Sequence, residues 1–388
     1  MSQCRWKYVK MHCGMWQTDI HKQHIYVKGV TSGREWSSDD FKELHRRSLS
    51  DEEVALRPVY AFLARWFSSS TFMEVQTSGS TGVPKRIKVE KTLMIRSAVR
   101  TCEFLGLKSE DTALLCMDMR YIGAMMMVVR ALVADMRLVV RHATGNPLRG
   151  VNERIDFLSV VPMQLFNTLQ VADEWECMIS IPYIIIGGGK VDKKMCDALK
   201  DVEGKVYSTY GMTETLSHIA LRKINGSDAS ECFLPLRGVA VSLSQQNTLV
   251  IKDNFLGGKE FVTNDVGEVF DDGSFVIFGR VDNVINSGGI KIQIEKDESL
   301  LAPYIDGLFA LSALPDVRLG EELVLLVEDR CEMKNEDLME IGRRCLPRYH
   351  EPKHIIRVKE IPVVGNSKID RTECRRLAES YYKKQRDL

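Results

Sequence analysis

The sequence lacks the patterns of several classes of protein. Its ten cysteines include no C-x-x-C pair, which argues against a structural zinc site or a dithiol redox centre. Its 53 basic and 53 acidic residues balance, so neither nucleic acid nor an anionic membrane is implied as a partner. Its most apolar stretch, residues 123–134, contains Arg130 and is too short to span a bilayer.

The amino-terminal residues also lack a targeting pattern. Basic residues occur in MSQCRWKYVK, but no apolar run follows them, so we expect no secretory signal. A length of 388 residues, with 44% hydrophobic and 27% charged residues, is typical of a globular protein with more than one domain. We therefore expect a cytoplasmic enzyme or binding protein. The sequence does not indicate whether it forms a homo-oligomer.

Strand-length apolar runs alternate with helical patterns in the first two thirds of the chain. Strands are expected at residues 113–119, 137–141, 157–161, 182–186 and 205–209, and helices at 53–67, 92–105, 122–134, after Pro162 and at 192–199. This alternation predicts a layered α/β domain with a largely parallel sheet. Its binding sites should lie at the carboxyl ends of the strands.

From about residue 248, apolar and polar residues alternate in shorter runs, a pattern typical of antiparallel β structure. A smaller α+β unit follows, with expected strands at 309–314, 323–328 and 355–358 and helices at 336–345 and 372–384. We place the boundary near Val281. The predicted domains are therefore residues 1–280, a large α/β domain, and residues 281–388, a small α+β domain.

The stretch QTSGSTGVPKRIK, residues 76–88, is predicted to hold phosphate oxygens. Its glycines can turn backbone N–H groups inward, its hydroxyls can donate and its lysine adds charge; these residues are Thr77, Ser78, Gly79, Ser80, Thr81, Gly82 and Lys85. It is not the G-x-x-x-x-G-K-[ST] nucleotide loop, because Arg86 rather than a hydroxyl follows the lysine. An ordinary flexible loop is the alternative.

Two further segments follow expected strands. Three glycines, Gly187 to Gly189, would let a flat ligand approach the backbone, although a plain turn is the alternative. The segment YSTYGMTET, residues 207–215, combines groups that could stack on a base, bind a phosphate and hold Mg²⁺. In the alternative, Tyr210 is a core residue and Glu214 lies exposed in a first helical turn capped by Thr213.

These segments occur in the order typical of a known family. The chain resembles the adenylate-forming superfamily of acyl- and aryl-CoA ligases, whose phosphate loop reads T-S-G-[ST]-T-G-x-P-K and whose later motif reads Y-G-x-T-E. Residues 77–85 and 210–214 match both. Further similar segments follow in order: TND at 263–265, GRVD at 279–282, SGG at 287–289, PD at 315–316, GE at 320–321 and KIDR at 368–371. An ordered set is far more specific than one loop.

The resemblance implies a role for each matched residue. The loop from Thr77 to Lys85 would hold the β- and γ-phosphates of ATP. Adenine would lie among Gly187, Gly188, Gly189, Tyr210 and Gly211. Thr213 would contact the α-phosphate, Glu214 would bind Mg²⁺, and Asp265 and Arg280 would hold the ribose. Asp282 would be the hinge, Lys368 the adenylation lysine, and Ser287, Gly288 and Gly289 the segment presented to coenzyme A.

The chain departs from the family pattern at several places. Its phosphate loop begins near residue 77, so we expect part of the amino-terminal subdomain to be shortened or absent. Asn264 replaces a glycine, and Ser367 replaces the glycine that usually precedes the adenylation lysine. Residues 118–124 lie where the family carries its aromatic substrate-gating motif, and Tyr121 could fill that place.

The resemblance implies an ATP- and Mg²⁺-dependent ligase that adenylates a small carboxylic acid and transfers the acyl group to coenzyme A. Residues 213–220 and 121–123 look most like the o-succinylbenzoate–CoA ligases of menaquinone biosynthesis. An aryl dicarboxylate would need a cationic or hydroxyl-rich pocket, for which Arg120, Ser217 and His218 are candidates; a surface or core position is the alternative for each. Two alternatives stay open: an enzyme that activates another aryl or fatty acid for a different acceptor, such as a carrier-protein thiol, and a nucleotide-binding homologue that has lost catalysis.

Overall fold

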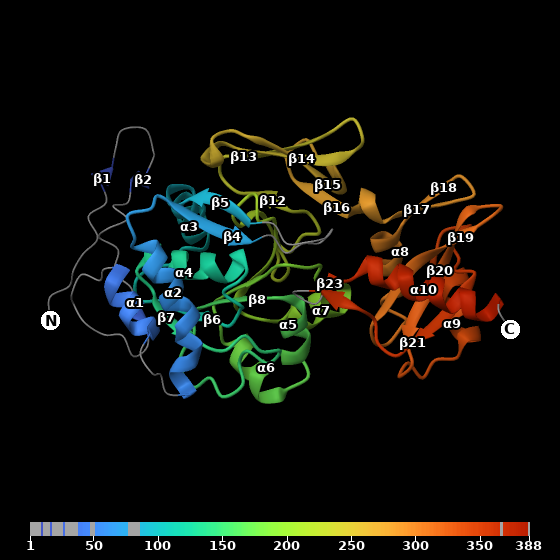
Figure 1. Ribbon diagram of the computed structural model, residues 1–388, viewed down its shortest axis with the longest axis horizontal. Coiled ribbons are helices and arrows are strands. Elements are labelled where there is room, and N and C mark those ends of the chain that lie inside the picture. The colour runs from blue at the N-terminus through green and yellow to red at the C-terminus, as the bar shows by residue number, and fades with distance from the viewer. Residues whose placement is uncertain are drawn as a thin grey trace. The chain divides into compact units, whose positions relative to one another are not determined.

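The structure is a computed structural model that describes residues 9–10, 16–17, 26–27, 38–46, 51–76, 86–364 and 368–386. The chain forms two compact units (Figure 1). The first comprises Met1–Gly188, Leu199–Val239 and Asp253–Lys259, and the second comprises Gly189–Ala198, Ala240–Lys252 and Glu260–Leu388. The boundary near Val281 stays a prediction about which parts move.

An eight-stranded sheet forms the centre of the first unit. The strand order is β12-β11-β10-β9-β8-β6-β7-β3; the strands from β10 to β3 are parallel, and β11 and β12 pair in antiparallel fashion at one edge. The strands are β3 (Tyr26–Val27), β6 (Thr112–Leu115), β7 (Arg137–Val140), β8 (Phe157–Val160), β9 (Tyr183–Ile186), β10 (Lys205–Gly211), β11 (His218–Lys223) and β12 (Leu234–Pro235). The predicted largely parallel sheet is therefore confirmed.

Helices of the first unit pack on this sheet and share one apolar core with it. The core joins Trp66, Met94 and Met126 of three helices to Leu115 and Leu138 of the sheet. The helices are α1 (Ser38–Arg46), η2 (Asp51–Leu56), α2 (Arg57–Trp66), α3 (Lys91–Leu105), α4 (Ile122–Ala134), α5 (Pro162–Thr168), α6 (Ala172–Ile179) and η3 (Asn254–Leu256).

One predicted helix, at residues 53–67, is divided in the structure. A 3₁₀ turn, η2, precedes α2, and Pro58 lies in the first turn of α2. Proline has no N–H to donate to the preceding turn, so a continuous α-helix is interrupted there. Helix α6 and strands β11 and β12 had not been predicted.

The second unit contains two sheets. Strands β13 (Val239–Leu243), β14 (Thr248–Asp253), β15 (Glu260–Val269) and β16 (Phe275–Arg280) form an antiparallel sheet in this order. The other sheet has the order β18-β17-β20-β19, with β21 paired in parallel to β20. Its strands are β17 (Val284–Ser287), β18 (Ile290–Gln293), β19 (Phe309–Asp316), β20 (Gly320–Glu328) and β21 (His354–Val358).

Helices cover the second sheet on both faces. Apolar residues of β19 and β20 alternate between two core clusters, so that Leu311 and Leu325 belong to one and Ala310 and Leu326 to the other. The remaining elements of this unit are α7 (Lys193–Leu199), η4 (Val281–Asn283), α8 (Ile294–Leu301), α9 (Asn335–Cys345), α10 (Arg371–Arg386) and the hairpin β22 (Val363–Val364) and β23 (Lys368–Ile369).

Two short strands and one hairpin complete the described elements. Strands β1 (Val9–Lys10) and β2 (Trp16–Gln17) pair with each other, and β4 (Phe72–Gln76) pairs with β5 (Arg86–Glu90). Within the described ranges, no helix is both long and apolar enough to cross a membrane. The same ranges contain no group of three or more His, Cys, Asp or Glu side chains arranged to hold a metal ion.

Candidate active site

The predicted phosphate loop, Thr77 to Lys85, lies outside the described residues, but the structure describes both of its ends. Gln76 at the end of β4 pairs with Arg86 at the start of β5, so the loop closes an antiparallel hairpin. Gln76 also forms a parallel bridge with Tyr121. Gln76, the last described residue before the loop, therefore lies next to Tyr121, the residue predicted to contact the acid.

The three glycines follow the carboxyl end of β9. A Cβ atom on Gly187 would come within 2.5 Å of the Thr209 hydroxyl oxygen, and Gly188 has a φ of +83°. A side chain at the first position would collide with β10, and the second takes a left-handed conformation that favours glycine. Because β9 and β10 are parallel neighbours, these glycines and Tyr210 lie at the same edge of the sheet.

The Y-G-x-T-E segment forms a tight turn between β10 and β11. A Cβ atom on Gly211 would lie 2.3 Å from the Ser217 carbonyl oxygen, so no side chain fits there. The buried Thr215 hydroxyl accepts from the Met212 N–H at 3.0 Å and lies 2.8 Å from the Ser217 carbonyl. Sequence patterns did not single out Thr215, whose hydroxyl fixes the turn.

The turn separates the two motif residues to which the resemblance gives catalytic roles. Thr213 is buried and Glu214 is exposed. Glu214 forms no hydrogen bond or ion pair with any described residue, so its carboxylate is free to bind a metal ion. The chain continues into β11, not into the helix of the alternative interpretation. Tyr210 is half-buried, with its ring 5.9 Å from that of Phe233.

A row of buried polar side chains begins at this turn. The Ser217 hydroxyl oxygen lies 3.4 Å from His218 Nδ1, and His218 Nε2 lies 3.0 Å from the Thr101 hydroxyl oxygen. Arg130 Nη2 donates to the Ser217 hydroxyl at 2.5 Å. Two residues predicted to contact substrate, Ser217 and His218, are thus joined to side chains from α3 and α4.

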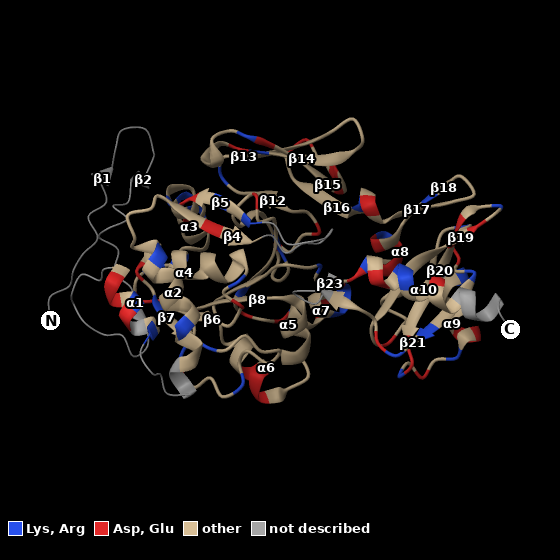
Figure 2. Ribbon diagram, viewed as in Figure 1, with Lys and Arg blue, Asp and Glu red and all other residues tan. Residues whose placement is uncertain are grey.

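Arg130 is the unexpected member of this row. It is the only charged residue of α4, whose ribbon is tan over most of its length in Figure 2. The side chain is 1% exposed, and its Nε has no hydrogen-bond partner. Burial lowers the pKa of Arg130 to about 10, against a small opposing effect of Cys102. Within the described part of the chain, no carboxylate pairs with Arg130.

The neighbouring His218 is neutral. Burial lowers its pKa well below 6.5, and the positive charges of Arg130 and Arg100 lower it further. Arg100 itself pairs with the buried Asp253 at 2.8 Å. His218 therefore acts as a hydrogen-bonding group in this row and does not carry a charge near neutral pH.

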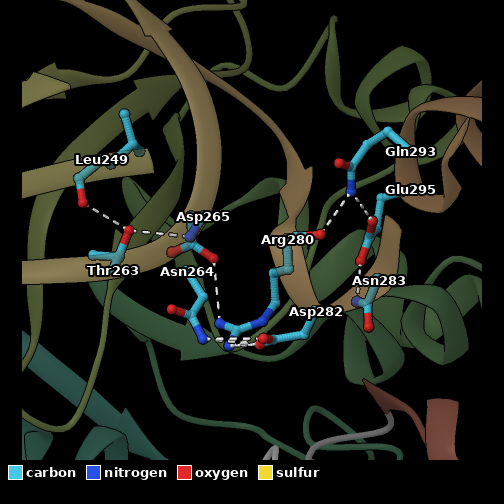
Figure 3. Close-up of polar contacts among 9 residues, drawn as sticks. All are labelled: Leu249, Thr263, Asn264, Asp265, Arg280, Asp282, Asn283, Gln293 and Glu295. Carbon is cyan, nitrogen blue, oxygen red and sulfur yellow. Dashed lines mark hydrogen bonds and ion pairs between the residues drawn. The ribbon is translucent and has the colours of Figure 1, made fainter. Parts of the chain in front are cut away.

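A second polar cluster joins the predicted ribose and hinge residues in the second unit (Figure 3). Asp265 and Arg280 are directly opposite on β15 and β16, and Arg280 Nη1 lies 3.3 Å from Asp265 Oδ1. Arg280 Nη2 lies 2.8 Å from Asp282 Oδ2. Asn264 Nδ2 reaches both oxygens of Asp282, at 3.2 and 3.0 Å. The residue that replaces a family glycine therefore binds the hinge carboxylate.

Charge balance sets the protonation of the hinge carboxylate. Burial would raise the pKa of Asp282, but hydrogen bonds from Arg280 and Asn264 and the charge of Arg280 outweigh burial and lower it. Neighbouring contacts support the cluster: Gln293 Nε2 donates to the Arg280 carbonyl at 3.0 Å, and Asn283 donates to Glu295 (Figure 3). Asp282 is therefore an anion held by two donors.

The segment predicted to meet coenzyme A is a turn between β17 and β18. Gly288 and Gly289 have φ values of +57° and +84°, and the Gly288 N–H donates to the Leu319 carbonyl at 2.8 Å. Ser287 precedes them and is buried. These glycines fit the left-handed turn, and the predicted contact with coenzyme A stays a prediction.

The predicted adenylation lysine, Lys368, lies in the hairpin before α10. The backbone of Lys368 is in β23, opposite Val364. Three residues further on, the Arg371 guanidinium binds both oxygens of Glu298 on α8, each at 2.6 Å. Glu298 also accepts from the Leu311 N–H at 2.8 Å. This two-bond ion pair anchors the segment that carries Lys368 to α8.

Comparisons with known proteins agree with this fold and these motifs. The family described as AMP-binding enzyme matches residues 70–276. The 2-succinylbenzoate–CoA ligase of Bacillus cereus strain AH820 is 27% identical, over 89% of this chain and 80% of that protein. A solved acyl-CoA synthetase (AMP-forming)/AMP-acid ligase II-like protein from Dyadobacter fermentans is 32% identical, with a TM-score of 0.57 over 87% of this chain and 97% of that one.

A further solved structure shows the same fold at lower identity. The o-succinylbenzoate coenzyme A synthetase of Bacillus subtilis, solved with ATP and a magnesium ion, is 20% identical and has a TM-score of 0.67 over 77% of this chain and 69% of that one. The layered α/β fold with its glycine-rich strand ends defines a nucleotide-binding enzyme of the adenylate-forming architecture. The chain belongs to the AMP-binding enzyme family.

Proposed function

We propose that the protein is an AMP-forming acid–CoA ligase whose acid substrate is o-succinylbenzoate. In the first half-reaction, a carboxylate oxygen of the acid attacks the α-phosphorus of ATP, and pyrophosphate leaves with the bond to the β-phosphate. In the second, the thiolate of coenzyme A attacks the acyl carbon of the adenylate and AMP leaves. The enzyme positions these groups and offsets their negative charge.

Named residues would hold the nucleotide in the first half-reaction. The Thr77–Lys85 loop would grip the β- and γ-phosphates, and Thr213 would contact the α-phosphate. The free, exposed carboxylate of Glu214 fits a Mg²⁺ ligand, and Mg²⁺ would neutralise phosphate charge. Lys368 would offset the repulsion between the attacking carboxylate and the α-phosphate.

The second half-reaction would need the small domain to turn. Asp282 would be the hinge, and rotation would present the Ser287–Gly289 turn to coenzyme A while removing Lys368. The left-handed glycines of that turn and the two donors that hold Asp282 support these roles.

The observation that carries the acid assignment is the buried Arg130. A buried guanidinium without an anion is costly, so such a group is normally paired. An acid with two carboxylates can react at one and place the other against Arg130 beside Ser217. Arg120, the cation first considered for this pocket, is 75% exposed and already pairs with Asp118 at 2.6 Å. Arg130 is therefore the better candidate.

The test is a panel of acids assayed for AMP release with ATP, Mg²⁺ and coenzyme A. We expect o-succinylbenzoate to give the highest kcat/KM, and Arg130→Lys to lower it through KM. If the wild-type enzyme does not activate o-succinylbenzoate but activates a fatty or monocarboxylic aryl acid, the proposed acid substrate is refuted. The proposal that the protein is an acid–CoA ligase would still stand.

The same assay separates the two alternative functions. A different acceptor would show as acid-dependent exchange of pyrophosphate into ATP without thioester formation from coenzyme A. Ser367, which replaces a family glycine, is the observation that motivates the alternative of an inactive nucleotide-binding homologue. Such a homologue would show no exchange with any acid. Loss of exchange in Lys368→Ala is expected, and full retention would contradict the role of that lysine. Cytoplasmic location stays a prediction.

A further inference from the structure

The row from Arg130 to Thr101 contains several hydrogen atoms whose positions follow from its geometry. Arg130 can only donate, so the Ser217 oxygen must accept from it. The Thr101 hydroxyl lies 3.2 Å from the Ser97 carbonyl, which can only accept. Neutral His218, between Ser217 and Thr101, has one donor nitrogen and one acceptor nitrogen.

Only one arrangement gives every hydroxyl and imidazole hydrogen of Ser217, His218 and Thr101 an acceptor. Ser217 donates to His218 Nδ1, His218 donates from Nε2 to Thr101, and Thr101 donates to the Ser97 carbonyl. In the opposite tautomer, Ser217 would accept from both Arg130 and His218, and its own hydrogen would find no acceptor in the row. Ser217 is only partly buried. Within the row, the first arrangement forms one more hydrogen bond than the opposite tautomer, so it is preferred.

We infer that His218, held as the neutral Nε2–H tautomer, is a positioning residue for the anionic end of the acid. Its Nδ1 accepts the Ser217 hydroxyl hydrogen, which fixes the rotation of that hydroxyl while its oxygen accepts from Arg130 Nη2. The unpartnered Nε and the remaining N–H groups of Arg130 are then left for the carboxylate that is not activated. This inference rests on the proposed function, because it takes the acid to have a second carboxylate.

The charges around His218 keep this arrangement at neutral pH. Arg130 faces His218 from α4 and Arg100 faces it from α3, and Arg100 is balanced by Asp253. Protonated His218 would donate from Nδ1 to Ser217 and reverse the row. A neutral His218 leaves Arg130 as the unpaired cation, which suits an acid site with one carboxylate to hold.

Nitrogen-15 NMR of histidine-labelled protein tests the tautomer without any substrate. The His218 signals are assigned by their loss in His218→Gln. Near neutral pH we expect the pattern of a neutral ring protonated on Nε2. A ring protonated on Nδ1, or an imidazolium, would overturn the inference even if the enzyme activates o-succinylbenzoate.

Two substitutions test the positioning role by kinetics. His218→Gln can accept from Ser217 and donate to Thr101, whereas His218→Leu can do neither. We expect His218→Leu to raise the KM for o-succinylbenzoate about tenfold, with kcat and the KM for ATP unchanged, and His218→Gln to stay within about threefold of wild type. Equal effects of the two substitutions, or equal effects on the KM for ATP, would contradict the role.

A failure of the proposed function gives a different result from a failure of this inference. Wild-type enzyme without o-succinylbenzoate activity would refute the proposed substrate, and the tautomer spectrum would still decide the state of His218. Wild-type enzyme with that activity, together with an unchanged KM in His218→Leu, would keep the substrate and reject the positioning role.

Discussion

The buried row around Arg130 and the polar cluster around Arg280 balance their charges in opposite ways. Arg280 is 33% exposed and lies 3.3 Å from one carboxylate and 2.8 Å from another. Arg130 is 1% exposed, and its side chain hydrogen bonds to the neutral Ser217 and to no other residue among those that the structure describes. Arg280 is therefore compensated by its own protein and by water, whereas Arg130 has no such anion within the described residues. The compensated Arg280 fits a predicted hinge that is stabilised by its own ion pairs. The uncompensated Arg130 fits a site for an anionic ligand.

Removing the uncompensated cation should have the largest effect. Arg130→Met should raise the KM for o-succinylbenzoate by about a hundredfold or more, because a buried charge pair with the substrate is lost. The free energy of unfolding should stay the same or rise by about 1–4 kcal/mol, because an unpaired buried charge is removed. Steady-state kinetics and urea unfolding measure both.

The matched change in the other region should behave differently. Arg280→Met leaves Asp265 and Asp282 without their cation, so the free energy of unfolding should fall. A destabilised Arg130→Met with an unchanged KM would mean that Arg130 is a structural residue like Arg280.

A second paired arginine allows the next comparison. Arg371→Ala removes both bonds to Glu298, which is 13% exposed, and releases the segment that carries Lys368. Exchange of pyrophosphate into ATP should fall about tenfold or more, while thioester formation from supplied acyl-adenylate should change little. The control is Arg376→Ala on the same helix, where the pair with Glu373 is exposed and no effect is expected. Equal loss in both half-reactions would contradict an anchoring role.

The two regions should also respond to acid at different pH. His218 has a pKa well below 6.5 in the folded protein, so the unfolded chain binds more protons and the free energy of unfolding falls as pH drops below 6.5. The pKa of Asp282 is lowered from 3.8, so its contribution is present above pH 3.8 and is lost only as pH falls through the lowered value. His218→Gln should flatten the fall in stability between these two values, and Asp282→Asn should not.

The smallest effect is expected at the residue that replaces a family glycine. Asn264→Gly removes two hydrogen bonds to Asp282, which is 39% exposed, so the free energy of unfolding should fall by less than about 1 kcal/mol. Thioester formation should become about two- to threefold faster if these bonds restrain the hinge. Asn264→Asp, which loses the same bonds and places a second carboxylate beside Asp282, should have a larger effect in the same direction. An unchanged rate of thioester formation in both variants would show that Asn264 does not restrain the hinge.

Much of the fold follows from patterns along the chain. The helix predicted at residues 122–134 matches α4, because an apolar stretch of that length, with Arg130 as its one charged residue, is best buried as a helix. The strand predicted at 113–119 ends at Leu115, since the segment that follows turns to form the Asp118–Arg120 ion pair. Strands β11 and β12 were missed because β11 begins only two residues after Leu216, whose φ is +65°, and no turn pattern predicts that reversal.

The site was predicted in part, for a physical reason. Motif spacing predicted the hinge residue Asp282, and the need for a polar pocket made Ser217 and His218 candidates; the roles of all three stay predictions. Arg130 lies in no such motif. From the sequence alone, one arginine in an apolar helix indicates only a break in the apolar pattern and predicts no function. Its meaning depends on contacts with Ser217, 87 residues away in the sequence, which only the folded chain reveals.

One binding experiment tests the central claim most directly. The affinity of o-succinylbenzoate, and of its analogue with the unreactive carboxylate changed to a carboxamide, is measured by calorimetry for wild type and Arg130→Met. If Arg130 holds that carboxylate, the two changes should not add, and the coupling energy should be about 2 kcal/mol or more. Additive losses, with a coupling energy near zero, would show that the carboxylate and Arg130 do not meet.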